Sequence, residues 1–248
     1  MKYSAIDIHC HYNSGGFHDP KSTVFHNRKL EYLLNEHHAA NIFKTAFSTY
    51  ESVCSSQNII EENEKLFSLS SKNEEIYQWV VIDPRKDDTL EQAHKLLKQF
   101  KVLGIKIHCA HGYDICDYGD KLFSFAQEER TTLLMHPTKI SEMPFYANKY
   151  PKMRLIIAHL YGSDHIDAVL AAQYGNIFVD TSGGDSVKNS IIEYAVSRIG
   201  SEKIYFGTDT YAAGFQYGRI AFSMMDDKDK ENILYKNALR DFPAFTNA

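Results

Sequence analysis

The sequence has little cysteine, and the spacing of its cysteines excludes the common cysteine-based sites. Its 248 residues contain four of them, which are Cys10, Cys54, Cys109 and Cys116. No two form a C-x-x-C pair, so neither a zinc ribbon nor a thioredoxin-like redox motif is indicated. Two fall inside apolar segments, and free cysteine is among the most commonly buried residue types. We therefore expect reduced thiols that pack in the core.

The sequence also lacks a long hydrophobic run and a basic stripe. No segment approaches the roughly 18 apolar residues that span a bilayer, and the first residues do not have the pattern of a secretory signal. Lysine and arginine are scattered, and the formal net charge is −5, so no patch is indicated for a phosphate backbone. We expect a cytoplasmic protein with a small-molecule substrate and with no membrane or nucleic-acid partner. If the chain associates, a homodimer is the expected state.

The sequence is rich in short apolar segments that recur at intervals of roughly one βα unit. Hydrophobic residues make up 44% of the chain, enough for one sizeable core, so we expect a single domain over residues 1–248. Four of the segments end in histidine or aspartate. The eight are Ser4–Cys10, Thr45–Tyr50, Tyr77–Asp83, Gly104–Cys109, Thr132–His136, Leu155–His159, Ile177–Thr181 and Ile204–Asp209.

Stretches of helical periodicity lie between these segments, and this alternation predicts a parallel sheet. The sheet could be open and doubly wound or closed into a barrel. Eight similar units need about 250 residues, and no glycine-rich phosphate loop follows the first segment. We therefore predict a (β/α)8 TIM barrel, in which Ser14, Gly15 and Gly16 form a mobile loop over the site.

The first segment carries three polar residues at alternate positions. Asp7, His9 and His11 should point to the same side of a regular strand, which inside a barrel is the interior. His9 and His11 could hold one metal ion between two imidazoles. Asp7, one step deeper, would then orient a ligand.

Three further polar residues end other segments. His136 precedes Pro137 and ends the fifth segment, and it is the expected third ligand; Asp209 ends the eighth and is the expected fourth. His159 ends the sixth segment. A single histidine at such a place is more commonly a hydrogen-bonded residue of the core edge. Five polar residues at strand ends are hard to attribute to packing, because their buried donors and acceptors would all need partners.

The ordered set of motifs resembles the amidohydrolase superfamily over essentially the whole chain. The closest likeness is to its amidohydrolase-related branch, which also contains aromatic-acid decarboxylases. The motifs are D-I-H-C-H at Asp7–His11, G-I-K-I-H at Gly104–His108, L-M-H-P ending at Pro137, I-I-A-H-L around His159, F-V-D-T-S at Phe178–Ser182 and F-G-T-D at Phe206–Asp209. The resemblance implies that His9, His11, His136 and Asp209 bind a divalent metal. It also implies that His159 acts as an acid or base, or binds a second ion.

Three neutral imidazoles and one carboxylate suit Zn²⁺ best and tolerate Mn²⁺, Fe²⁺ or Ni²⁺. The principal hypothesis is a metal-dependent hydrolase that uses metal-activated water on a small substrate with an amide, ester or lactone bond. Asp209 would carry the proton of the water, and His159 would stabilise the developing oxyanion. The alternatives are a metal-dependent decarboxylase of a small carboxylic acid, a two-metal phosphoesterase and a binding barrel without turnover.

Lys106 lies on the expected fourth strand, where some members of the superfamily carry a carbamylated lysine or a glutamate that bridges two metals. Lys106, with His159, therefore marks a possible second metal site. The plainer interpretation is an ion pair between Lys106 and Asp7 or another interior acid, because an unpaired buried ammonium is costly. His108, His111 and Ser182 follow the fourth and seventh strands, and we expect them to contact the substrate.

Overall fold

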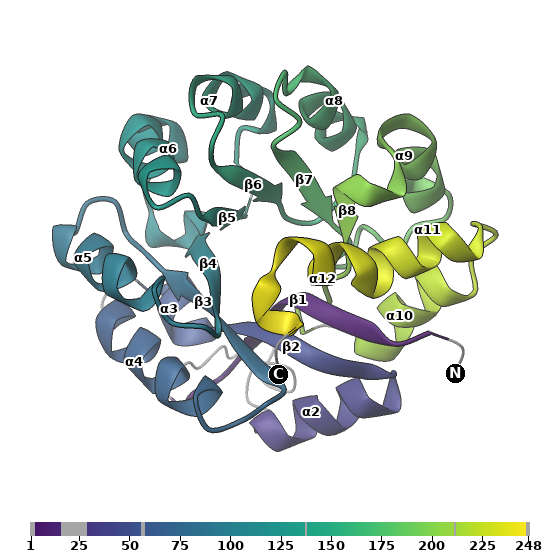
Figure 1. The fold of residues 1–248 in the computed structure, drawn as a ribbon, viewed down its shortest axis with the longest axis horizontal. Helices are drawn as coiled ribbons and strands as arrows, with labels where there is room; N and C mark the ends of the chain where they lie inside the picture. The colour runs from purple at the N-terminus through teal and green to yellow at the C-terminus, as the bar shows by residue number, and fades with distance from the viewer. Residues whose placement is uncertain (1–2, 16–28, 56–57, 137, 211, 247–248) are drawn as a thin grey trace.

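Eight parallel strands form a closed ring, and helices surround it (Figure 1). The computed structural model describes residues 3–15, 29–55, 58–136, 138–210 and 212–246. The strands are β1 (Ala5–Tyr12), β2 (Ile42–Thr49), β3 (Ile76–Val81), β4 (Val102–Ile107), β5 (Thr132–Met135), β6 (Arg154–Ile157), β7 (Ile177–Asp180) and β8 (Ile204–Tyr205). Their order in the sheet follows the chain.

Backbone hydrogen bonds between β1 and the segment that follows β8 close the ring. The amide of Ile8 in β1 donates to the carbonyl of Phe206 at 3.0 Å, and the amide of Asp209 donates to the carbonyl of His9 at 2.8 Å. The predicted (β/α)8 barrel is thus confirmed. Gly16, the last residue of the predicted loop over the site, lies outside the described residues. Pro137, which follows the expected ligand His136, lies outside them too. The Ser14 hydroxyl donates to Glu62 Oε2 at 2.7 Å.

The helices pack their apolar faces on the outside of the strands. They are α2 (Leu30–Ala39), α3 (Tyr50–Cys54), α4 (Ile59–Ser70), α5 (Asp87–Leu96), α6 (Gly119–Glu128), α7 (Met143–Lys149), α8 (Ser163–Ala171), α9 (Ile191–Ile199), α10 (Ala213–Ala221), α11 (Asp227–Glu231) and α12 (Asn237–Asp241). Because helices cover one face of each strand and the barrel core fills the other, the strands are apolar almost throughout. Within the described residues, no helix has the length and apolar character needed to cross a bilayer.

The last segment of the chain closes one end of the barrel. In Figure 1, α12 crosses the near end of the ring. Phe245, just after it, packs on Tyr77 of β3 with ring centroids 4.4 Å apart, and Phe242 packs on Trp79 at 5.8 Å. This is the end at which the strands begin. The carboxyl ends of the strands, where active sites of such barrels lie, are left for the functional residues.

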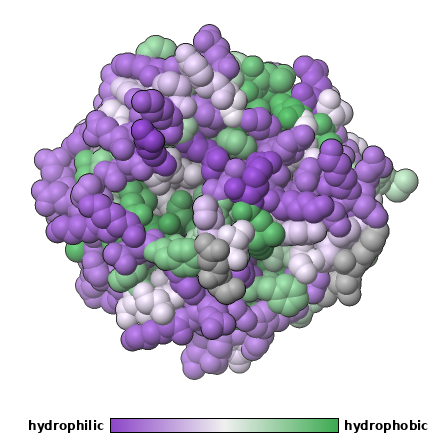
Figure 2. All heavy atoms as spheres, viewed as in Figure 1, coloured by the Kyte–Doolittle hydropathy of each residue, from purple (hydrophilic) through white to green (hydrophobic). Residues whose placement is uncertain are grey.

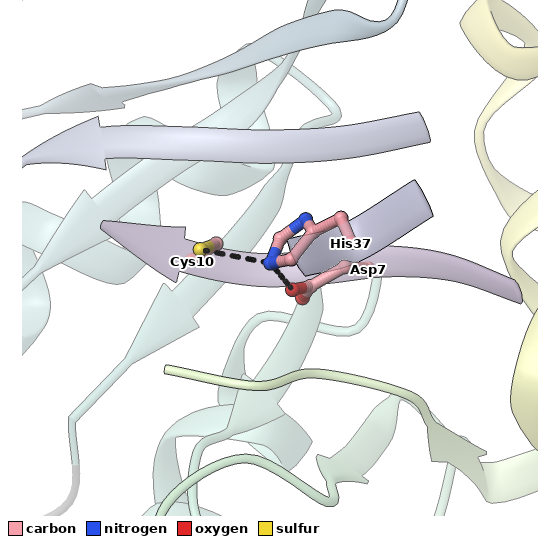
Figure 3. A group of neighbouring side chains, drawn as sticks. All are labelled: Asp7, Cys10 and His37. Atoms are coloured by element: carbon pink, nitrogen blue, oxygen red, sulfur yellow. Dashed lines mark hydrogen bonds and ion pairs between the residues drawn. The ribbon is translucent and has the colours of Figure 1, made fainter. Parts of the chain in front are cut away.

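A β-bulge in β1 reverses the orientation expected for one acidic residue. Asp7 pairs with Thr45 of β2 and Cys10 pairs with Phe47, so a step of three residues on β1 lies opposite a step of two. Asp7 and Cys10 therefore face α2, where His37 Nε2 lies 3.7 Å from Asp7 Oδ2 and 4.0 Å from Cys10 Sγ (Figure 3). The expectation that Asp7 shares the inner face with His9 and His11 was wrong, because it assumed a regular strand.

Asp7 instead links β1 to the end of β8, and this makes the stability of the fold depend on pH. Its carboxyl accepts hydrogen bonds from the amide and hydroxyl of Thr208 at 3.1 and 2.6 Å. Burial raises the pKa of Asp7 to about 8, although the hydrogen bonds from Thr208 and the His9 amide oppose the shift. The folded state therefore binds this proton more tightly than the unfolded state does.

We expect the contribution of Asp7 to the free energy of unfolding of the metal-free protein to be lost as the pH rises from about 4 to about 8. Asp7→Asn should keep the fold, since an amide resembles the protonated acid, and its stability relative to the wild type should rise over this range. Urea unfolding of both proteins at pH 4.5, 6 and 7.5 measures the difference. A difference that does not change with pH would contradict the raised pKa of Asp7.

Candidate metal centre

Two histidines of β1 and one aspartate after β8 meet inside the carboxyl end of the barrel. Asp209 Oδ1 lies 3.2 Å from His11 Nε2 and 3.8 Å from His9 Nε2. One donor atom from each of the three lies within 4.8 Å of the others. Ligand atoms at about 2.0–2.2 Å from one ion are spaced by roughly this distance, so the three side chains fit a shared divalent cation.

Hydrogen bonds behind the two imidazoles fix their orientation. His9 Nδ1 lies 2.8 Å from Asp180 Oδ2, and His11 Nδ1 lies 2.8 Å from the hydroxyl of Ser48. With Nδ1 held in this way, each ring presents Nε2 toward Asp209, the arrangement typical of metal-bound histidines. The sequence analysis gave no role to Asp180 or Ser48. Asp180 could have been found, because it lies at the carboxyl end of the seventh apolar segment, one residue before Thr181.

His136 and His159 form a second pair beside this group. His136 Nδ1 lies 2.9 Å from His159 Nε2, and His159 Nδ1 lies 2.9 Å from the hydroxyl of Ser182. The His159 amide donates to Asp180 Oδ1 at 3.0 Å, so Asp180 positions both His9 and His159. Within the described residues, the donor atoms of His136 do not join the compact group of His9, His11 and Asp209.

The backbone at two of these residues has an unfavourable conformation. His159 and Asp209 have φ values of 63° and 54°, in the left-handed region that costs most residues about 1 kcal/mol or more. Gly183 makes room for His159, because a Cβ at this position would lie 2.9 Å from His159 Nδ1. Such strain is concentrated at functional sites in proteins, where the surrounding structure maintains it.

The protonation states of the donors are those that a metal requires. Burial lowers the pKa of His9 to about 3, with a further contribution from the charge of Lys106, and burial lowers the pKa of His136 to about 4. Burial alone would raise the pKa of Asp209, but the His11 hydrogen bond and the neighbouring histidines hold it well below its usual range. Neutral imidazoles thus surround an ionised carboxylate.

Lys106 of β4 lies against His9 of the same group. Its side chain is fully buried, and its Nζ lies 2.6 Å from His9 Nε2. Burial lowers the pKa of Lys106 to about 8, against the opposing charges of Asp209 and Asp180. The expected ion pair with Asp7 is absent from the described contacts, because the bulge turns Asp7 outward. Lys106 contacts an imidazole of the metal group instead.

The three expected substrate contacts lie at different depths. The ring of His108 is 4.5 Å from that of His136, so it borders the group. His111 is buried against α3, with its Nε2 2.7 Å from the carbonyl of Ser52. Ser182 is fully buried behind the imidazoles, with its hydroxyl 2.9 Å from Nδ1 of both His9 and His159. A cavity of about 290 Å³ opens in front of His136, His159 and Asp209.

The barrel and the donor group of His9, His11 and Asp209 are typical of metal-binding (β/α)8 barrel proteins, and the family comparison agrees. The family model described as Amidohydrolase matches residues 6–243, so the chain belongs to the amidohydrolase family. No curated protein matches the sequence.

Solved structures of three other proteins share the fold at low identity. The chain is similar to a dihydroxybenzoic acid decarboxylase from Polaromonas sp. JS666 with bound manganese and the inhibitor 2-nitroresorcinol (14% identity, TM-score 0.77, 99% of this chain and 98% of that chain). It is similar to 5-carboxyvanillate decarboxylase from Sphingomonas paucimobilis (12%, 0.77, 97% and 99%). It is also similar to a putative amidohydrolase from Staphylococcus aureus (13%, 0.74, 97% and 100%).

Proposed function

We propose that the protein is a metal-dependent decarboxylase of a small carboxylic acid. The observation that carries this proposal is the convergence of His9, His11 and Asp209 within 4.8 Å of one another at the mouth of the barrel. The names of two of the similar structures support decarboxylation. The sequence alone favoured hydrolysis, and the comparisons favour its alternative.

The charges of the site suit an anionic substrate. A divalent ion adds two positive charges, and Lys106 adds another beside His9. Two carboxylates, Asp180 and Asp209, oppose them. The excess of positive charge, in a site that is largely buried, attracts a substrate carboxylate and stabilises the negative charge that develops when it leaves.

The residues around the cavity have different roles in the proposed reaction. The ion, when bound, supplies Lewis-acid stabilisation of the developing negative charge. As the C–C bond breaks, its electron pair stays on the substrate carbon, CO2 leaves, and the carbon takes a proton. We assign this proton to His159, which borders the cavity and whose other ring nitrogen is held by Ser182. His136 would be a further ligand to the ion if its imidazole turned away from His159, and His108, whose ring lies 4.5 Å from that of His136, would border the substrate.

Hydrolysis is the second candidate, because the family is described as Amidohydrolase. The same residues would serve it: Asp209 would accept a proton from the attacking water, and His159 would stabilise the oxyanion. A two-metal phosphoesterase requires a second ion near Lys106 and His159, and a binding barrel requires no turnover. The cytoplasmic location, the small soluble substrate and the homodimer stay predictions. Zinc does too, since manganese occupies one similar structure and the donor types accept both.

Metal analysis followed by a substrate panel tests the proposal. We expect about one equivalent of Mn²⁺ or Zn²⁺ per chain after reconstitution. We also expect release of CO2 from at least one hydroxylated benzoic acid, abolished by chelation and restored by the metal. Amides, esters, lactones and phosphate esters form the comparison panel. Turnover of these without CO2 release from any acid would refute decarboxylation, and two equivalents of metal would favour a bridging Lys106.

Ser182 acts, on this proposal, as a positioning residue and not as a substrate contact. Its hydroxyl holds both His9 and His159 from behind. We expect Ser182→Ala to lower metal affinity and kcat by about 10- to 100-fold, as is common when such outer partners are removed, with little change in KM. Steady-state kinetics and competition with a chelating dye measure these effects. A rise in KM alone would show that Ser182 contacts the substrate instead.

A further inference from the structure

A second cavity lies at the opposite end of the barrel from the metal centre. It measures about 460 Å³ and lies among the first residues of β5, β6 and β7. We call it the amino-end cavity; its lining includes Arg130, Lys152, Arg154, Asn176, Phe178 and Asp241. A neighbouring cavity of about 390 Å³ shares Arg130, Arg154 and Asp241 with it. Figure 2 shows this end of the molecule, where hydrophilic side chains gather between α6, α7 and α12.

The lining is more positive than the rest of the chain. Three cations line the amino-end cavity, and Asp241 is the carboxylate among the lining residues. Asp241 is already engaged by Arg154 Nη2 at 3.0 Å and by the hydroxyl of Tyr205 at 2.6 Å. Among the described residues, no carboxylate forms an ion pair with Arg130 or Lys152. In a chain of net charge −5, this concentration of cations marks a site for an anion.

A fourth cationic side chain, Lys203, lies next to two residues of the lining, Phe178 and Gly175. Lys203 Nζ lies 4.4 Å from the centroid of the Phe178 ring, and Arg154 Cζ lies 5.3 Å from it. Lys203 Nζ also donates to the carbonyl of Gly175. Burial lowers the pKa of Lys203, and the charges of Arg240 and Arg154 lower it further. A bound anion would relieve this crowding of like charges.

We propose that the amino-end cavity binds a phosphorylated small molecule. Its phosphate lies among Arg130, Lys152 and Arg154, and the rest of the molecule fills the remaining volume of the cavity. The volume lies within the range of small-molecule sites, about 300–1,000 Å³. Arg130 has a φ of 49°, a conformation that glycine or asparagine adopts at lower cost after a helix. Arginine is therefore present there at a conformational cost that anion binding explains.

Calorimetry on the metal-loaded protein tests the proposal, with ribose 5-phosphate and inorganic phosphate as probes. The test variant is Arg130→Asn/Lys152→Gln, in which asparagine tolerates the left-handed backbone. The control is Lys72→Gln/Lys95→Gln, which removes two exposed charges outside the cavity and gives the same net charge. Circular dichroism checks that both variants fold.

We expect saturable binding of one ribose 5-phosphate per chain, at least tenfold weaker in the test variant and unchanged in the control. Inorganic phosphate should bind more weakly than ribose 5-phosphate, because it fills less of the cavity. Equal binding in all three proteins would overturn the proposal, since it would place the phosphate at the metal centre. Equal weakening in both variants would overturn it as well, since it would show non-specific attraction.

Discussion

Asp209→Asn protein is expected to lose its metal and its turnover while keeping its fold. The Asp209 carboxylate lies 3.2 Å from His11 Nε2 and 3.8 Å from His9 Nε2, and it supplies the negative charge of the donor set. An amide keeps the shape but not the charge. We expect metal affinity to fall by at least 100-fold and kcat/KM by at least 1,000-fold, since Asp209 both binds the ion and borders the cavity.

The matched control for this variant is Asp185→Asn. Asp185 lines the same cavity, but its carboxylate pairs with Lys188 at 2.6 Å and is exposed to solvent. Metal content by mass spectrometry should be unchanged in the control, and turnover of the same substrate should fall far less than in Asp209→Asn. Full metal occupancy and activity in Asp209→Asn would show that Asp209 neither binds the metal nor takes part in turnover.

His159→Asn is expected to separate metal binding from chemistry. The His159 imidazole borders the cavity and contacts His136 and Ser182, but it lies outside the group of His9, His11 and Asp209. We therefore expect metal content near that of the wild type and a loss of about 100- to 10,000-fold in kcat, the range for a lost acid or base. KM should change by less than threefold.

His94→Asn serves as the control for this second variant, because His94 is exposed and pairs with Glu129 on the surface. Solvent isotope effects add a readout that a purely structural role would not change. In the wild type the isotope effect should report proton transfer to carbon. Wild-type kcat in His159→Asn would refute the assignment, and loss of the metal would make His159 a ligand.

The sequence was sufficient to predict the barrel because each strand is buried on both faces. Eight apolar segments repeat at regular intervals, and seven of the observed strands are at least four residues long. The eighth is only Ile204–Tyr205, since the chain after it turns to bond with β1. Helical periodicity in the sequence extends over 186–199, but α9 begins only at Ile191, because Ser190 takes a left-handed conformation with a φ of 70°.

The site was predictable only where strand ends carry the relevant side chain. His9, His11 and Asp209 could be proposed as neighbours, since parallel strands of a barrel end at one face. The bulge that turns Asp7 away leaves no clear pattern in the residues themselves. The hydroxyl of Ser48 likewise gains its role from a contact with His11 across β1 and β2, which periodicity does not show.

The contacts among the buried groups also depend on side-chain geometry that spacing does not specify. Lys106 was expected in the interior, and it lies there, but its neighbour is His9 and not Asp7. His136 was expected beside Asp209, and it is hydrogen bonded to His159. A cation bound by His9, His11 and Asp209 would repel the ammonium of Lys106 from His9. It would also attract the imidazole of His136 away from His159.

Anomalous diffraction from crystals of the reconstituted protein, collected at the manganese and zinc edges, tests the central claim most directly. We predict one strong peak at about 2.0–2.3 Å from His9 Nε2, His11 Nε2 and an oxygen of Asp209. The peak should disappear in crystals of Asp209→Asn. A peak elsewhere, or none at these three side chains in metal-saturated crystals, would contradict the account.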